Sequence, residues 1–424
     1  MADSIGNDTE LKKGQGGEVW LRRGMALWIV LAVAVTVKTL VQGDHHSVYK
    51  VFAVASQNWW ANRSLYDLYD GIGIYLYSPT FAVAFTPFAM LPSRLGNILW
   101  NLPCLFLLLW SLRLLVRHVL PGEWTLRREG VFVGLGALIS VPMVWTAQSN
   151  TLLIALIGFS AAAIVQQRWW MASCLLAVPV FIKLWPMAVV LLLMACWPRQ
   201  LVWRFPVPIA VLATVPFLTR PFNIVLQQYQ SWYVCLTRVQ QGRLPGYRDA
   251  WTIWEELCPP PDRQIYMFMQ LGAAALVLVW CLWQKRRTRS TGYLLTLILS
   301  MWVCWQLLLG PGTEQLTYGI IAPSMAWAVA STFGSRKRGH VLAVTACAIV
   351  ILFGLGDVEK EVLSFLPFAR VILPMGVALF AAWLVRYGRG LITCGRTDID
   401  SRFMKTGRDA PGTGRSDSHL RAAS

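Results

Sequence analysis

The sequence predicts an all-α, polytopic integral membrane protein. Hydrophobic residues make up 56% of the 424 residues and charged residues only 14%, and the mean hydropathy is +0.50. This apolar content exceeds that of a soluble domain. Basic residues gather in the short connections between long apolar stretches, as the positive-inside rule describes. The net charge of +17 therefore indicates membrane topology, and we expect no nucleic-acid partner.

A helix needs about 20 apolar residues to cross the hydrocarbon core of a bilayer. On that basis the chain has about twelve candidate spans, near residues 25–42, 98–116, 131–147, 149–166, 171–183, 185–197, 203–219, 265–283, 291–309, 316–333, 340–356 and 368–385. The stretches 171–183 and 185–197 are short and are separated at Pro186, which breaks the helical hydrogen-bond ladder, so they are two half-spans or one kinked span. The segment 81–91 is short and flanked by prolines, and we expect it to be re-entrant or to lie on the surface.

The orientation of the chain follows from its first span. Four basic residues precede it, and no signal cleavage site is evident after it, so we expect a signal anchor with a cytoplasmic amino terminus. The chain then divides into a cytoplasmic segment (1–24), a transmembrane domain (25–390) and a disordered cytoplasmic tail (391–424). Cys235 and Cys258 share an outer loop, which makes them the one plausible disulfide pair.

The first outer loop, residues 43–97, is long and mixes aromatic with polar residues, as in Asn58-Trp59-Trp60. Such a segment predicts short amphipathic helices lying on the membrane, with Trp and Tyr at the headgroup level. The aromatic residues serve either as interfacial anchors or as stacking surfaces for sugars.

Asp44 follows the first span by two positions. An acid where the chain leaves the bilayer is a candidate general base for chemistry on a lipid-linked substrate, and the alternative is that it solvates a loop. His45 and His46 come next and are rival candidates for the same role. Adjacent histidines point in different directions and lack an obvious third ligand, so we predict no metal site.

Other polar residues lie at the same depth as Asp44. Gln148 and Asn150 occupy a tight outer turn, where they bind sugar hydroxyls or cap the following helix. Lys183 lies within apolar sequence, where ionisable residues are costly and usually functional; it holds a lipid phosphate or extends to the interface. Glu314 and Tyr318 stand in the last outer loop, with helix capping as the alternative role for Glu314.

In these residues the chain resembles the GT-C glycosyltransferases, and among them glycosyltransferase family 87, the polyprenyl-phosphate-mannose-dependent alpha-mannosyltransferase group. The resemblance covers residues 25–390 and rests on the order of several short motifs: the acid after the first span, Val48-Tyr49 with Leu65-Tyr66, Tyr77-Ser78-Pro79 with Pro87, Gln148 with Asn150, and Ile182-Lys183-Leu184-Trp185-Pro186. The family commonly has two prolines where this chain has Ser78-Pro79. Its histidine in the late outer loop is absent.

The resemblance implies a GT-C-like helical bundle that moves a hexose, with mannose as the first expectation, from a polyprenyl-phosphate-sugar donor to a lipid or glycan acceptor. The site would face outward from a bacterial plasma membrane, among membrane lipids, and need no cofactor. Asp44 would be the general base and Lys183 would hold the phosphate. The remaining substrate-binding candidates are His45, His46, Tyr49, Tyr77, Gln148, Asn150, Glu314 and Tyr318. A transporter or flippase of lipid-linked saccharides is the alternative, although we see no inverted repeat of the kind common in transporters.

Overall fold

The computed structural model describes residues 2–68, 71–241, 246–259, 261–333, 338–355 and 368–387, with side chains from residue 16 onward except at 239–241. Within these ranges the regular elements are helices, and an isolated antiparallel bridge joins Tyr247 to Glu314. The predicted all-α polytopic fold class is confirmed.

The helices follow one another closely along the chain. The first half contains α1 (Ala2–Gln42), α2 (Tyr49–Trp60), α3 (Pro79–Ala84), α4 (Thr86–Ala89), α5 (Ser93–Leu114) with the π-helical turn η1 (Leu115–Val119), α6 (Leu126–Trp145), α7 (Asn150–Val165), α8 (Trp169–Ile182), α9 (Met187–Cys196) and α10 (Pro198–Leu201). The second half contains α11 (Pro206–Thr214) with η2 (Val215–Leu218), α12 (Phe222–Gln241), α13 (Ala250–Leu257), α14 (Arg263–Arg287), α15 (Thr291–Leu309), η3 (Gln315–Ile321), α16 (Ala322–Thr332), α17 (Arg338–Gly354) and η4 (Ala369–Val371), which opens a final span.

Seven of the described helices are long and apolar enough to cross a membrane: Gly16–Gln42, Ser93–Val119, Leu126–Trp145, Pro198–Leu218, Arg263–Arg287, Thr291–Leu309 and Ala369–Tyr387. Four further predicted spans coincide with shorter apolar helices, α7, α8, α9 and α17. The stretch expected at 316–333 is divided between η3 and α16. The chain is thus a multi-pass membrane protein, and its helices match the predicted stretches without reproducing twelve full-length spans.

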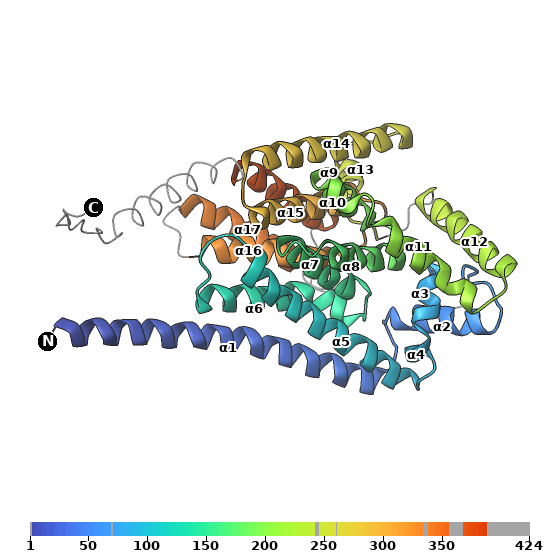
Figure 1. Ribbon diagram of the computed structural model, residues 1–424, viewed down its shortest axis with the longest axis horizontal. Coiled ribbons are helices and arrows are strands. Elements are labelled where there is room, and N and C mark those ends of the chain that lie inside the picture. The colour runs from blue at the N-terminus through green and yellow to red at the C-terminus, as the bar shows by residue number, and fades with distance from the viewer. Residues whose placement is uncertain are drawn as a thin grey trace, which may run out of the picture.

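The first outer loop folds into a compact layer of its own. Figure 1 shows α2, α3, α4 and α12 gathered at the end of the molecule away from the amino terminus, while α1 and α14 run along opposite long edges. The ring of Phe52, on α2, packs edge-on against Tyr77, Phe81, Phe85 and Trp100 at centroid distances of 4.8 to 6.0 Å. The predicted short helices of this loop are present, and the segment 81–91 forms short helices instead of a span.

Three other predictions concern the covalent chain and its divisions. Cys235 and Cys258, the one plausible disulfide pair in the sequence, are both free thiols. The Cys235 thiol lies 3.9 Å from the carbonyl oxygen of Tyr75, because α12 packs against that loop, while Cys258 follows α13. Helix α1 runs without a break through the predicted boundary at residue 24. The predicted tail, 391–424, lies outside the described residues.

Candidate active site

The turn between α6 and α7 is fixed by donors from other parts of the chain. Ala147 has a φ of +54°, a left-handed conformation that is unfavourable for a residue with a Cβ atom. The carbonyl groups around it accept four hydrogen bonds: Asn101 Nδ2 to Val144 at 2.8 Å, Lys38 Nζ to Trp145 at 2.7 Å, Val48 N to Thr146 at 2.9 Å, and Trp100 Nε1 to Ala147 at 3.1 Å. These bonds tie α1, the first outer loop and α5 to one rigid turn.

Four of the predicted site residues meet beside this turn, and we call them the polar cluster: Tyr77, Gln148, Asn150 and Lys183. The Asn150 amide donates to Gln148 Oε1 at 2.8 Å, and the Lys183 ammonium donates to Asn150 Oδ1 at 3.3 Å. The same ammonium lies 5.1 Å from the centre of the Tyr77 ring, within cation–π range. Residues from the first loop, the α6–α7 turn and the end of α8 therefore converge.

The helix break predicted at Pro186 brings Lys183 into the cluster. Helix α8 ends at Ile182, and Lys183 is extended, with φ −139° and ψ 145°. Its ammonium reaches inward to Asn150 rather than out to the interface. The capping alternative for Gln148 and Asn150 is also not observed, because Ser149 is the N-cap of α7 and makes no side-chain capping bond.

Several buried polar atoms near the cluster have no hydrogen-bond partner among the described residues. They are Ser149 Oγ and Thr151 Oγ1 on either side of Asn150, Trp185 Nε1 two positions after Lys183, and Trp302 Nε1, whose ring stacks on Trp185 at 5.6 Å. Native proteins pair nearly all such groups, so each unpaired one requires an explanation. These four atoms are thus available to a polar ligand.

An apolar pocket adjoins the polar cluster. Its wall is built by α3, α5, α7, α8 and α11, and its lining residues include Thr80, Phe81, Trp100, Leu152, Phe181 and Ile182. The pocket has a volume of ≈ 170 Å³, and a dry cavity of about 150 Å³ accommodates a benzene molecule. The ring of Phe81, in the pocket wall, lies 5.4 Å from the ring of Tyr77, which faces Lys183. A cation and an apolar pocket side by side suit a ligand with an anionic head and a hydrocarbon tail.

Asp44 lies in the turn that follows α1, and two residues that sequence reasoning missed hold its carboxylate. The Ser93 hydroxyl donates to Asp44 Oδ2, and the Asn97 amide donates to Oδ1 at 2.9 Å. Asn97 also donates to the Ser47 hydroxyl at 3.3 Å. Each carboxylate oxygen has a second lone pair. The carboxylate is therefore oriented and still able to accept a proton.

The two histidines and Tyr49 differ in their surroundings. His45 and His46 are exposed, with ring centroids 4.5 Å apart, and no group of three potential metal ligands occurs among the described residues. Tyr49 is buried and donates to the Phe88 carbonyl at 2.8 Å. Burial, reinforced by the negative charge of Asp44, raises the pKa of Tyr49 to about 12, so this phenol stays a neutral donor.

Glu314 and Tyr318 lie where two loops are joined by hydrogen bonds between Arg248, Thr313 and Tyr318, which we call the clasp. The backbone of Arg248 donates to the Thr313 carbonyl at 2.8 Å, and the buried Tyr318 hydroxyl donates to the Arg248 carbonyl at 2.6 Å. The side chain of Glu314 is exposed beside this clasp. These contacts join the 310–318 loop to the segment that leads into α13.

Asp44 and Lys183 lie on either side of the α6–α7 turn. Val48, four positions after Asp44, donates to the Thr146 carbonyl at one end of the turn, while Lys183 contacts Asn150 at the other. The apolar layer beneath the turn includes Tyr49, Tyr77 and Ile182 in one contiguous cluster. The α6–α7 turn thus connects the segment that carries Asp44 with the residue that Lys183 contacts.

Comparison with known proteins gives one family match. Residues 75–311, more than half of the chain, match the model of Glycosyltransferase family 87. This range contains the whole polar cluster, whereas Asp44, Glu314 and Tyr318 lie outside it. The crystal structure of ArnT from Cupriavidus metallidurans bound to undecaprenyl phosphate aligns with a TM-score of 0.34 and 14% identity, over 88% of this chain and 78% of that one. No curated protein matches the sequence.

Proposed function

Because the chain belongs to glycosyltransferase family 87, we propose that this membrane glycosyltransferase moves a hexose, in the first instance mannose, from a polyprenyl-phosphate-sugar to a lipid or glycan acceptor at the outer face of a bacterial plasma membrane. The observation that carries the proposal is the position of Lys183, which lies in the polar cluster beside an apolar pocket. A polyprenyl-phosphate-sugar has parts that match this arrangement: a hydrocarbon chain for the pocket, a phosphate for Lys183 and a sugar for the amides of the polar cluster.

The polar cluster and the pocket bind different parts of the donor. The pocket receives the isoprene units next to the phosphate, and the Lys183 ammonium pairs with the phosphate oxygens. Gln148 and Asn150 present neutral amides to the sugar hydroxyls. The unpartnered hydroxyls of Ser149 and Thr151 are further donors at the same place.

Asp44 acts as the general base in the proposed reaction. The acceptor hydroxyl oxygen forms the new bond to the anomeric carbon while its proton passes to Asp44. The bond between the anomeric carbon and the phosphate oxygen breaks, and its electron pair leaves with the polyprenyl phosphate. Lys183 stabilises that departing charge. Ser93 and Asn97 hold the Asp44 carboxylate in position throughout.

The exposed residues next to Asp44 contribute to acceptor binding. His45 and His46 flank the carboxylate at the surface, where an acceptor arrives from water. The reaction as written needs no general acid, because the phosphate leaves without protonation.

The test is sugar transfer by the purified protein supplied with polyprenyl-phosphate-mannose, other polyprenyl-phosphate hexoses and extracted membrane lipids. We expect transfer from the mannose donor and a loss of about 10²- to 10⁴-fold in Asp44→Asn, the usual contribution of a general base, with donor binding retained. Asp262→Asn is the matched control, since Asp262 is the N-cap of α14 and asparagine caps equally well.

Two results would contradict the proposal in different ways. Equal transfer by wild type and Asp44→Asn would remove Asp44 as the base and direct attention to His45 and His46. Lipid movement across liposomes, with no transfer from any donor, would favour a flippase.

A further inference from the structure

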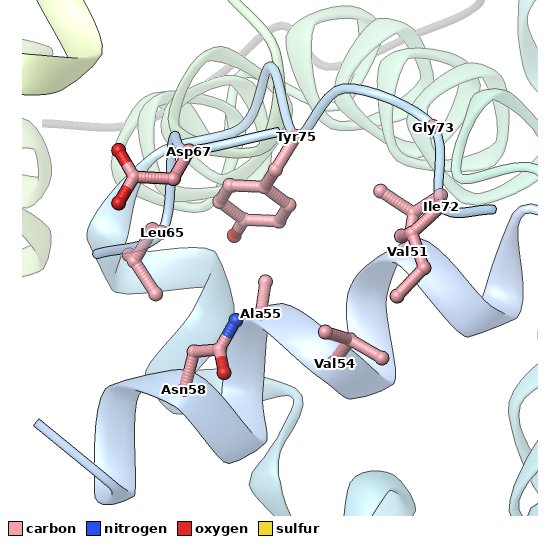
Figure 2. Close-up of a pocket in the computed structure, with 9 residues that line it drawn as sticks. All are labelled: Val51, Val54, Ala55, Asn58, Leu65, Asp67, Ile72, Gly73 and Tyr75. Carbon is pink, nitrogen blue, oxygen red and sulfur yellow. The ribbon is translucent and has the colours of Figure 1, made fainter. Parts of the chain in front are cut away.

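A second, smaller hollow lies within the first outer loop, between α2 and the chain that leads to Tyr77. Most of its lining residues are apolar, and two polar side chains face each other across it, as Figure 2 shows. The Asn58 amide points into the hollow from α2, and the Tyr75 hydroxyl points in from the opposite side. The space holds about one water molecule or one hydroxyl group.

Asn58 has an unmet hydrogen-bonding requirement in this hollow. Its side chain is only 6% exposed, and its Nδ2 atom has no partner among the described residues. Leaving a buried amide unpaired is costly. The hollow is thus suited to a group that accepts a hydrogen bond from Asn58.

Tyr75 supplies the complementary acceptor. Its hydroxyl donates to the Ser78 carbonyl at 2.9 Å, which commits its only proton. The Ala82 backbone N–H interacts with the same oxygen, so one lone pair remains for a ligand. Burial raises the pKa of Tyr75 well above its ordinary value, so the phenol stays protonated. A ligand group in the hollow can therefore accept from Asn58 and donate to Tyr75.

This pair of contacts selects the chemistry of the ligand. An ammonium has no lone pair with which to accept from Asn58. A phosphate accepts but cannot donate when ionised, and the exposed carboxylate of Asp67 at the rim repels it. A neutral hydroxyl, of a sugar or of water, does both.

The walls are held in place by other elements. Leu65 donates from its backbone to Gln228 Oε1, on α12, at 3.2 Å. The Tyr66 hydroxyl donates to the Tyr77 carbonyl at 2.9 Å. The Tyr75 ring lies 5.4 Å from the Tyr77 ring, which in turn faces Lys183. The hollow is therefore a built feature that one ring contact, between Tyr75 and Tyr77, connects to the polar cluster.

We propose that this hollow is a subsite for one hydroxyl group of the glycan acceptor, bound between Asn58 and Tyr75. Its assignment to an acceptor rests on the proposed transferase function, whereas sugar binding as such does not. The subsite would place a neighbouring sugar of the acceptor against the first outer loop while the reacting hydroxyl approaches Asp44.

The test is a site-resolved binding titration that needs no turnover. The full chain in lipid nanodiscs, with ¹³C-labelled valine methyl groups, is titrated with methyl α-mannoside and methyl β-glucoside. Val51 and Val54 line the hollow, and Val189 in the main core is the internal control. We expect at least one hexoside to shift the Val51 and Val54 signals without moving that of Val189.

Two variants make the result specific. Asn58→Leu should weaken the titration roughly tenfold, as expected for the loss of one buried hydrogen bond. Tyr75→Phe keeps the ring and should weaken it by a similar factor, which covers the case in which Asn58→Leu fails to fold. No shift with either hexoside would show that the hollow holds an ordered water only, and unchanged titrations in both variants would also overturn the subsite.

The outcome is separable from that of the proposed function. A hexoside that shifts the Val54 signal in a protein that transfers no sugar would support the hollow as a sugar site and contradict the transferase function. Transfer that depends on Asp44, without any hexoside shift, would do the reverse.

Discussion

The two ends of α9 each have a half-buried lysine, and the lysines have different surroundings. Lys183 precedes the start of the helix and donates to the side chain of Asn150. Lys285, from α14, reaches the other end and donates to the carbonyl of Cys196, the last residue of α9. It also lies 5.9 Å from the centre of the Trp197 ring.

From this difference we infer a structural role for Lys285 and a functional role for Lys183. A positive charge on the final carbonyls of a helix satisfies unpaired acceptors and complements the helix dipole, so Lys285 has a sufficient role without any ligand. Lys183 instead contacts an amide that is itself held by Gln148, next to unpartnered polar atoms and an apolar pocket. The surroundings of a buried lysine, rather than its depth, indicate its role.

The largest expected effect is the difference between Lys183→Met and Lys285→Met in sugar transfer. Methionine keeps an unbranched side chain and removes the charge in both cases. We expect Lys183→Met to lower transfer from polyprenyl-phosphate-mannose by about 10²- to 10³-fold, the range for losing a preorganised group that stabilises a developing charge. Lys285→Met should leave transfer per folded molecule close to that of wild type.

Transfer rates measured on equal amounts of folded protein decide between these roles. Similar losses in both variants would show that the two lysines act alike, through stability. A full rate in Lys183→Met would exclude it as the phosphate ligand.

A smaller effect is expected from the residue that holds Lys183. Asn150→Leu keeps the volume of a fully buried side chain and removes the acceptor at 3.3 Å from the ammonium. Because two hydrogen bonds in the donor site are lost, one with Lys183 and one with Gln148, we expect kcat/KM for the donor to fall roughly 30-fold. Ser160→Ala is the matched control on the same helix, since the Ser160 hydroxyl bonds within its own turn, to the Ile157 carbonyl.

A change in kcat/KM for the acceptor alone, with the donor unaffected, would assign Asn150 to the acceptor side. An equal loss in Ser160→Ala would attribute the effect to α7 as a whole.

The sequence predicts the polar cluster because each of its members stands out locally. Lys183 is an isolated charge in apolar sequence next to a proline break, and Gln148 and Asn150 are amides in a tight turn between spans. Lys285 begins the basic run Lys285-Arg286-Arg287, which the positive-inside rule explains without a ligand. The neighbouring residues in the sequence therefore distinguish Lys183 from Lys285.

The residues that were missed have no such local signal. Ser93 and Asn97 are single polar residues at the start of α5, and they meet Asp44 across 49 and 53 positions of sequence. The hollow at Asn58 forms only because residues 65–68 and 71–75 fold back over α2. The composition of the first outer loop does not predict this fold. The sequence leaves the pairing of Cys235 with Cys258 open for a related reason, since sharing a loop does not bring two thiols together when α12 directs Cys235 toward Tyr75.

The smallest expected effect concerns stability at the other end of α9. Lys285→Met removes a donor from the Cys196 carbonyl and a charge from the helix terminus, and each contribution is modest. We expect the free energy of unfolding to fall by roughly 1 kcal/mol, seen as a lower midpoint in thermal unfolding of the detergent-solubilised protein. Lys285→Arg should recover most of this loss, because a guanidinium also donates to a carbonyl. Lys183→Arg, by contrast, should unfold at the wild-type midpoint but support less transfer than wild type. A planar guanidinium does not reproduce a compact ammonium at a phosphate. If Lys285→Met unfolded at the wild-type midpoint, the Cys196 contact would contribute nothing to stability, and the structural role assigned to that lysine would have to be abandoned.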